Sequence, residues 1–351
     1  MYQEIKLPNG ARLLTEAVPG ARSAALGFFV GVGSRHEAPK ENGAAHFIEH
    51  MLFKGTGLRT AAQLARDMDA IGGQVNAYTT KEHTAFYARC LDSHLDRALD
   101  ILSDMLFHSR FDQSDVEMER GVILEEIGMY EDTPEDLVSE RLNAAVFKGT
   151  PLARPILGTR ATLSAMTGES LALWHREHYR PGSMVAALTG HFTSAQVDRL
   201  VNCLSALEPG PAPDQPAAAY RPAVTAKRKA IEQNHLILAF PALPYLAERR
   251  PQMLLLNTLL GAAAPPGCSR RCGRSGACAT PSTPTCPTTP TPACWASTPP
   301  STRSRRARRW TRSARWPPTW PNTAPPRRSW SGYGSRPRPT CLWVPSPSSP
   351  G

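Results

Sequence analysis

Residues 44–56 read A-A-H-F-I-E-H-M-L-F-K-G-T, and this stretch places three side chains that prefer water inside an apolar segment. His46 and His50 are four residues apart, and Glu49 follows His46 by three. Residues at these spacings share one face of an α-helix, about one turn from each other. The pattern predicts a helix over residues 43–53 whose two imidazoles and one carboxylate point at the same spot.

Two imidazoles on one helical face favour a bound metal ion. Zinc prefers nitrogen, oxygen and thiolate ligands in tetrahedral geometry, and its catalytic sites use three protein ligands with water in the fourth position. His46 and His50 supply two ligands, and Glu49 is placed to accept the proton of a bound water and pass it to a leaving amine. The alternative is a chance pair that only completes the helix surface.

A third ligand is expected from a carboxylate elsewhere in the chain. The stretch M-E-R-G-V-I-L-E-E-I-G-M-Y contains Glu119 and Glu126, which are seven residues apart. This separation is two helical turns, so both lie on the same face of a long helix, for which Ser114 and Asp115 are candidate N-caps. Glu119 also has a simpler interpretation as a solvated helix charge.

The remaining sequence before residue 210 predicts an α+β domain, with sheet and helices mixed in order. A hairpin is expected at the start, because two strand-like segments flank the N-G turn at Asn9 and Gly10. Further apolar or periodic segments predict buried strands and amphipathic helices. The expected strands are 23–33, a pair within 72–90, and 184–191, and the expected helices are 60–71, 95–107 and one opening near 114.

The domain organisation follows from composition. Residues 1–210 are expected to form the catalytic domain, and a Pro- and Ala-rich linker occupies residues 211–222. A strand at 234–241 and a helix at 250–261 then begin a second domain over residues 223–261. From residue 262 onward the sequence has no strand or helix periodicity.

The basic charge belongs to the last part of the chain. The formal net charge is +10, yet residues 1–261 contain 26 basic and 30 acidic groups. Residues 262–351 contain fourteen Arg, no Asp, Glu or Lys, and six of the eight Cys, in a Pro-, Ser- and Thr-rich sequence. A Pro-rich disordered tail is one interpretation. An altered reading frame in a GC-rich gene is favoured, because ordinary disordered tails are poor in Trp and Cys.

The frame hypothesis is consistent with the codon table. Suitable codons for residues 267–285, read from two bases into the Pro266 codon, encode R-L-F-Q-E-V-R-E-E-R-G-L-R-Y-A-V-Y-S-Y, which is an amphipathic helix running into a strand. The codons are our choice, so the result shows consistency only. We expect residues 262–351 to be an aberrant, frameshifted and disordered tail.

Composition also limits the class of protein. The hydrophobic fraction is 41%, and no apolar run approaches the roughly 18 residues of a membrane span. The first residues lack the basic-then-apolar pattern of a secretory signal. Only Cys90 and Cys203 precede residue 262, which fits a reducing compartment. We expect a cytoplasmic protein without membrane contact.

The motif and its surroundings resemble a known family. H-x-x-E-H, followed 76 residues after His50 by Glu126 in an E-R-x-V-I-x-x-E context, is similar to the pitrilysin and insulinase family of zinc peptidases, which includes the mitochondrial processing peptidases. Residues 33–56, 75–88 and 178–191 resemble family blocks in family order. The resemblance covers residues 1 to about 261 and implies an α+β metallohydrolase fold with one intact domain and a truncated second copy.

The resemblance implies a role for each candidate residue. It makes His46, His50 and Glu126 the ligands of one zinc ion, Glu49 the general base, and Glu119 a carboxylate that orients the site. It also implies a zinc-dependent endopeptidase that cleaves extended peptides or presequence-like segments. The substrate would add as a strand to a sheet edge near the metal, with backbone contacts at Asn76 and Ala77.

The resemblance also raises a question about activity. Family members have two related halves around a chamber, and the second half contributes an Arg and a Tyr from an R-G-L-x-Y stretch. Residues 267–285 as given do not contain that stretch. Because remote substrate binding positions the scissile bond, we expect weak or no turnover by this polypeptide alone.

Other interpretations stay open. A non-catalytic scaffold or partner subunit predicts a broken H-x-x-E-H or a missing distal Glu, and neither is seen. A nucleic-acid binder would use the Arg and Trp of the tail, which we consider the weaker explanation of that segment. The expected partners are a peptide substrate and a second copy or a related peptidase-like subunit. His83, His175, His178 and His191 are expected to be structural or surface residues.

Overall fold

Most of residues 2–257 and two later strands are described by the structure, which is a computed structural model. The described residues are 2–214, 218–231, 235–244 and 246–257, with the backbone of 294–298 and 340–344. The chain divides into two units, one of Met1–Asp132 with Gly149–Ala218 and one of Thr133–Lys148 with Ala219–Gly351.

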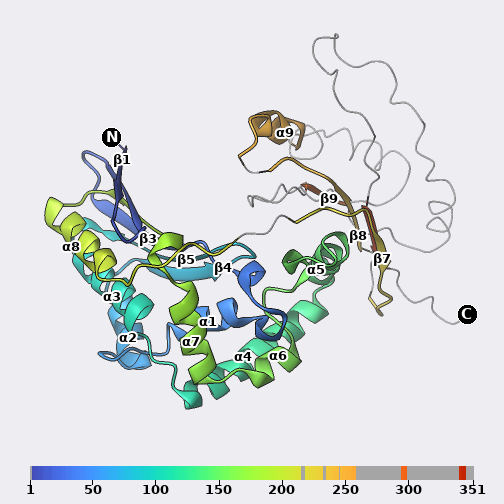
Figure 1. Ribbon diagram of the computed structural model, residues 1–351, viewed down its shortest axis with the longest axis horizontal. Coiled ribbons are helices and arrows are strands. Elements are labelled where there is room, and N and C mark those ends of the chain that lie inside the picture. Colours follow the sequence, from blue (N-terminus) through green and yellow to red (C-terminus); the bar gives the residue numbers. More distant parts are fainter. Residues whose placement is uncertain are drawn as a thin grey trace, which may run out of the picture. The chain divides into compact units, whose positions relative to one another are not determined.

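The first unit is built on a six-stranded mixed sheet (Figure 1). Its spatial order is β1-β2-β6-β3-β5-β4, and all neighbours are antiparallel except β2 and β6, which run parallel. β4 is therefore an edge strand and β6 a central one. The strands are β1 (Tyr2–Lys6), β2 (Arg12–Ala17), β3 (Ser23–Val30), β4 (Gln74–Thr79), β5 (Thr84–Leu91) and β6 (Met184–Gly190).

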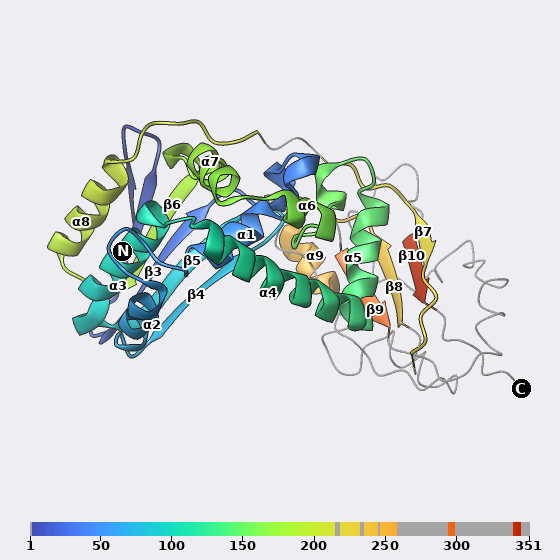
Figure 2. The same cartoon turned by 90° about the horizontal axis from the view of Figure 1, so that it is seen from below.

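Helices of the same unit pack against this sheet (Figure 2). Phe28 and Phe86 of the sheet and Phe47 and Ile48 of α1 are almost fully buried in one core cluster. Burying a side chain of this size contributes about 1.5–3 kcal/mol. The helices are α1 (Ala44–Met51), α2 (Ala61–Asp69), α3 (Leu95–His108), α4 (Gln113–Asp132), α6 (Arg160–Ala165), α7 (Gly168–His178) and α8 (Ser194–Ser205).

The structure confirms the α+β class, the opening hairpin and the predicted elements of this unit. One detail differs, because α4 begins at Gln113, so that Ser114 and Asp115 lie inside the helix rather than capping it. The carbonyl of Asp112 accepts hydrogen bonds from the amides of Asp115 and Val116, both at 3.1 Å. Asp112 is as good a capping residue type as Ser114 and Asp115. The sequence therefore defines the start of this helix only to within a few residues.

The second unit contains a four-stranded sheet in the order β7-β10-β8-β9. β8 pairs antiparallel with β9 and β10, and β7 pairs parallel with β10. Helix α5 packs against β7, β8 and β10, although the chain on both sides of it belongs to the first unit. The elements are α5 (Pro134–Val146), β7 (Val224–Ala226), β8 (His235–Phe240), α9 (Arg250–Asn257), β9 (Cys294–Thr298) and β10 (Thr340–Val344).

Strands β9 and β10 are exceptions to the expectation that residues 262–351 lack regular structure. Both are five-residue stretches without Pro or Arg, and a stretch without Pro keeps every amide available for a strand ladder. The rest of this tail lies outside the described residues, and its frameshift stays a prediction. Among the described helices, none is long and apolar enough to cross a membrane.

The start of α1 is fixed by a buried carboxylate. Glu37 is 2% exposed, and its Oε2 accepts hydrogen bonds from the Gly43 amide at 2.9 Å and from Asn42 Nδ2 at 2.8 Å. Its Oε1 accepts from the Ala45 amide at 2.9 Å. Gly43 has φ of 102°, and a Cβ there would lie 2.9 Å from the Cα of Gly158, so this position requires glycine. Amides at a helix start have no acceptor within the helix, and the Glu37 carboxylate provides an acceptor from outside it.

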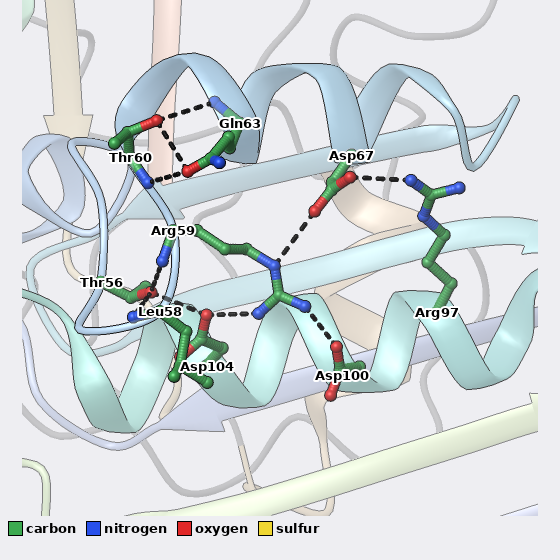
Figure 3. A network of polar contacts seen from close by, with 9 residues as sticks. All are labelled: Thr56, Leu58, Arg59, Thr60, Gln63, Asp67, Arg97, Asp100 and Asp104. Atoms are coloured by element: carbon green, nitrogen blue, oxygen red, sulfur yellow. Dashed lines mark hydrogen bonds and ion pairs between the residues drawn. The ribbon is translucent and has the colours of Figure 1, made fainter.

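The loop after α1 is held by an arginine network (Figure 3). The guanidinium of Arg59 forms ion pairs with Asp67 of α2 and with Asp100 and Asp104 of α3. Asp104 is 4% exposed, and it also accepts a 2.8 Å hydrogen bond from Thr56 Oγ1. The network therefore ties the loop of residues 52–60 to two helices.

We predict that Arg59→Met lowers the free energy of unfolding by about 2–4 kcal/mol, because it leaves the buried Asp104 carboxylate without its cation. Arg97→Met is the matched control, since Arg97 contacts Asp67 at the surface and is 48% exposed. Its cost should stay below about 1 kcal/mol. Urea unfolding of both variants measures the difference, and equal costs would contradict a structural role for the Arg59 network.

We also predict that Glu37→Ala lowers the free energy of unfolding by about 1–3 kcal/mol, because the amides of Gly43 and Ala45 lose their acceptor in a buried site. Glu208→Ala is the control, because the Glu208 side chain is 87% exposed. The control should change stability by no more than about 0.5 kcal/mol. Urea unfolding again separates the two, and an unchanged Glu37→Ala would rule out this cap.

Candidate metal centre

Three side chains from two helices converge in the first unit. His46 and His50 lie on α1, and Glu126 lies on α4, which packs against α1. The Oε2 atom of Glu126 is 3.6 Å from His46 Nε2 and 3.7 Å from His50 Nε2. One ligand atom from each of the three residues lies within 4.8 Å of the others. Within the described residues this is the one group of three or more His, Cys, Asp or Glu with such geometry.

The donor set fits a zinc ion. Two ligand atoms at about 2.0–2.1 Å from a tetrahedral zinc lie roughly 3.4 Å apart. The separations from Glu126 Oε2 to the two Nε2 atoms are 3.6 and 3.7 Å, close to that value. The centroids of the two imidazole rings are 4.7 Å apart and the ring planes are inclined at 66°, so the rings are not stacked. Two nitrogens and one oxygen also leave a fourth position for water.

The two histidines are held differently. His50 Nδ1 lies 3.1 Å from Oε2 of Glu119, and the other oxygen of Glu119 lies 2.6 Å from Lys54 Nζ. A ligating histidine usually gives its second ring N–H to a carboxylate or carbonyl, which fixes the tautomer. His46 Nδ1 is buried and has no hydrogen-bond partner in the described part of the chain. Glu119, which is 4% exposed, is therefore a buried carboxylate rather than a solvated helix charge.

The electrostatics separate the two imidazoles. Burial, together with the neighbouring His50, lowers the pKa of His46 to about 4, so its ring is neutral at neutral pH. Burial alone would lower the pKa of His50. The carboxylates of Glu126 and Glu119 raise that pKa by more than burial lowers it, so the net shift is upward. The hydrogen bond with His50 lowers the pKa of Glu126. The cluster therefore contains an ionised carboxylate facing imidazole nitrogens, as a cation site requires.

Glu49 projects from α1 toward strand β4. Its Oε2 accepts a 2.5 Å hydrogen bond from Thr79 Oγ1 at the end of β4. Burial raises the pKa of Glu49, and the Thr79 hydrogen bond opposes that shift. The raised pKa makes Glu49 a better proton acceptor than an exposed carboxylate, which suits a general base.

Asn76 and Ala77 lie on β4, at the edge of the six-stranded sheet. Asn76 pairs with Tyr87 and Ala77 with Phe86 on β5, and no strand of the described chain pairs with the other side of β4. The side chain of Asn76 accepts a 2.9 Å hydrogen bond from the Ala77 amide. Because Thr79 of the same strand contacts Glu49, the edge runs past the candidate base.

Two residues of this site were not singled out from the sequence. Thr79 lies thirty residues from Glu49, and no local pattern links them. Lys54 has a readable signal, since it follows His50 by four residues, the spacing of one helical turn. The histidines expected to be structural lie outside the cluster: the pKa of His175 is lowered to about 4 by burial, and His191 Nδ1 is 2.6 Å from Asp92.

Family models match most of the described chain. A model described as insulinase, peptidase family M16, matches residues 12–160, and one described as peptidase M16 inactive domain matches residues 165–282. His46, His50, Glu126, Glu49 and Glu119 all lie within the first match.

Curated relatives with similar sequences are named as zinc proteases. An uncharacterized zinc protease of Bacillus subtilis is 40% identical over 262 residues, covering 74% of this chain and 64% of the relative. An uncharacterized zinc protease of Streptomyces coelicolor is 42% identical over 265 residues, covering 73% of this chain and 58% of the relative. This chain thus spans less than two thirds of the length of these relatives.

The fold is shared with solved proteins at low identity. A protease from Helicobacter pylori has a TM-score of 0.79 at 17% identity, covering 87% of this chain and 76% of that one. A peptidase M16 inactive domain from Pseudomonas fluorescens also has a TM-score of 0.79 at 17% sequence identity, and the match covers 86% of this chain and 74% of that one. Together with the matches to the two domain models and to zinc proteases at about 40% identity, this shows that the chain belongs to the insulinase family, peptidase family M16.

Proposed function

We propose that this chain carries the catalytic half of a zinc-dependent endopeptidase that hydrolyses extended peptides. The observation that carries the proposal is the convergence of two imidazole nitrogens and one carboxylate oxygen from helices α1 and α4. We assign His46, His50 and Glu126 as the ligands of one zinc ion. A zinc ion bound there supplies a Lewis acid that polarises the scissile carbonyl and acidifies a water molecule.

Glu49 is the proposed general base. It takes a proton from the attacking water and later gives it to the leaving amine, so that a peptide bond and one water become a carboxylic acid and an amine. The hydrogen bond from Thr79 Oγ1 holds one carboxylate oxygen of Glu49, which leaves the other oxygen to accept the proton. Glu49 is only half-buried, so a substrate and a water molecule can reach it.

The substrate is proposed to bind along β4. An edge strand offers unpaired backbone groups, and a peptide that adds to it gains affinity from main-chain hydrogen bonds. Asn76 and Ala77 are the proposed backbone contacts, on the strand whose last residue contacts Glu49. A substrate strand must therefore displace the Asn76 side chain from the Ala77 amide. Presequence-like segments are a proposed substrate class, and the cytoplasm is the proposed location.

Activity of this polypeptide alone is proposed to be weak. The relatives named as zinc proteases extend well beyond the part that this chain matches. A second copy or a related subunit is the proposed partner. A second candidate function is a non-catalytic partner subunit, which the match of residues 165–282 to an inactive-domain model favours. The candidate zinc residues, however, lie outside that match. Nucleic-acid binding through the Arg-rich tail concerns residues that are mostly outside the described ones.

We predict that Glu49→Gln retains zinc and loses hydrolysis, whereas His50→Ala loses both. General-base catalysis contributes about 10²- to 10⁴-fold, so kcat for Glu49→Gln should fall by at least about 100-fold. Zinc content after dialysis and cleavage of a fluorogenic peptide measure the two effects. Equal zinc content in the unmodified protein and His50→Ala would refute the ligand assignment, and undiminished hydrolysis by Glu49→Gln would refute the base.

We also predict that resequencing the DNA across codons 255–290 corrects the reading frame to encode R-L-F-Q-E-V-R-E. The support is the change of composition at residue 262, together with alignments to curated relatives that cover 74% and 73% of this chain. A corrected frame means that the sequence after residue 262 is misreported. An unchanged frame would refute the frameshift and identify the chain as a truncated relative.

A further inference from the structure

A lysine that the proposed mechanism does not use is joined to the candidate metal ligands. Lys54 Nζ lies 2.6 Å from Oε1 of Glu119, and Oε2 of the same carboxylate lies 3.1 Å from His50 Nδ1. The two oxygens of Glu119 are thus divided between one cation and one imidazole. We propose that Lys54 is a positioning residue, which holds the Glu119 carboxylate in the orientation that sets the ring and tautomer of His50. This inference rests on the proposed zinc site.

The burial of Glu119 makes the lysine contact important. The Glu119 side chain is 5% exposed and that of Lys54 is 30% exposed. A carboxylate bound at one oxygen alone can rotate about its side-chain torsion, whereas one bound at both oxygens has a fixed plane. Without Lys54, Oε1 would be buried with no donor that the described structure records. The carboxylate would then turn to find another partner, and Oε2 would leave His50.

The tautomer of His50 depends on that contact. A neutral imidazole carries its proton on one nitrogen, and a hydrogen bond from Nδ1–H leaves Nε2 with the lone pair that a metal needs. Nε2 is the His50 atom that faces Glu126. His46 has no such partner for its Nδ1 in the described residues. His50 is therefore the ligand whose orientation can be tuned through a hydrogen-bond chain.

The backbone around Lys54 is anchored, so its ammonium group has a defined reach. Its amide donates to the Met51 carbonyl at 3.0 Å, which continues the last turn of α1. The next residue, Gly55, accepts a 3.1 Å hydrogen bond from the Arg110 amide. Thr56 is bonded to Asp104 in the network of Figure 3. The loop thus connects the Arg59 network to the candidate metal centre through Lys54.

The test is a zinc-affinity titration of the full chain against a chromophoric chelator. Lys54→Met should weaken zinc binding by about tenfold, the lower end of the range for residues that support a metal ligand indirectly. Lys54→Arg keeps a cationic donor and should stay within about threefold of the unmodified protein. Lys40→Met is the matched control, because Lys40 is 85% exposed, and it should change affinity by less than about twofold.

A double-mutant cycle separates positioning from a general structural effect. If Lys54 acts through Glu119, then Lys54→Met should cause no further loss of zinc affinity in a Glu119→Gln background. An unchanged affinity in Lys54→Met, or the same loss in both backgrounds, would overturn the inference while leaving the zinc site intact. If the unmodified chain binds no zinc, the proposed function fails and this inference fails with it. Should Lys54→Met not fold, Lys54→Gln replaces it in the same cycle.

Discussion

The packing of α1 against α4 is the contact on which the candidate site depends. Helix α1 supplies two imidazoles at adjacent turns, but a third ligand atom reaches them only because Glu126 is brought in from 76 residues further along the chain. Ile48 of α1 and Ile123 of α4 are both fully buried in the common core. The apolar faces of the two helices therefore set the distance between the nitrogens and the carboxylate, and the polar groups occupy the space that this packing leaves.

Holding a cation site of this kind requires that its ligands be oriented before the ion arrives. Burial disfavours charge, and the neutral form of His46 that results is the form that can coordinate a metal. His50 and Glu126 are instead held by opposite charges nearby, so the cluster is kept together by its own electrostatics. Glu37 adds a further constraint, because its hydrogen bonds to the amides of Gly43 and Ala45 fix where the helix starts and hence where His46 points.

The sequence predicts most residues of the candidate site, and the contacts that it does not predict depend on how distant elements pack together. The i, i+4 spacing of His46 and His50 and the two-turn spacing of Glu119 and Glu126 are local periodicities, so they can be read without a structure. Which of the two glutamates faces the imidazole Nε2 atoms depends on the rotation of α4 against α1, which local periodicity does not determine. The Thr79 contact is set by strand β4 lying beside α1. Helix α5 packs against strands that begin at residues 224, 235 and 340, and its own amphipathic pattern does not identify those partners.

The central position of β6 has a consequence for the order of folding. This strand lies between β2 and β3, so the sheet remains divided into two parts until residue 190 has been synthesised. Pairings of such long sequence separation form slowly and expose strand edges meanwhile. All residues of the candidate metal centre precede β6, yet the sheet behind them closes only when it arrives. The last residue of the first unit is Ala218. Whatever sequence the ribosome adds after that point, the strands that support the centre are already encoded and complete.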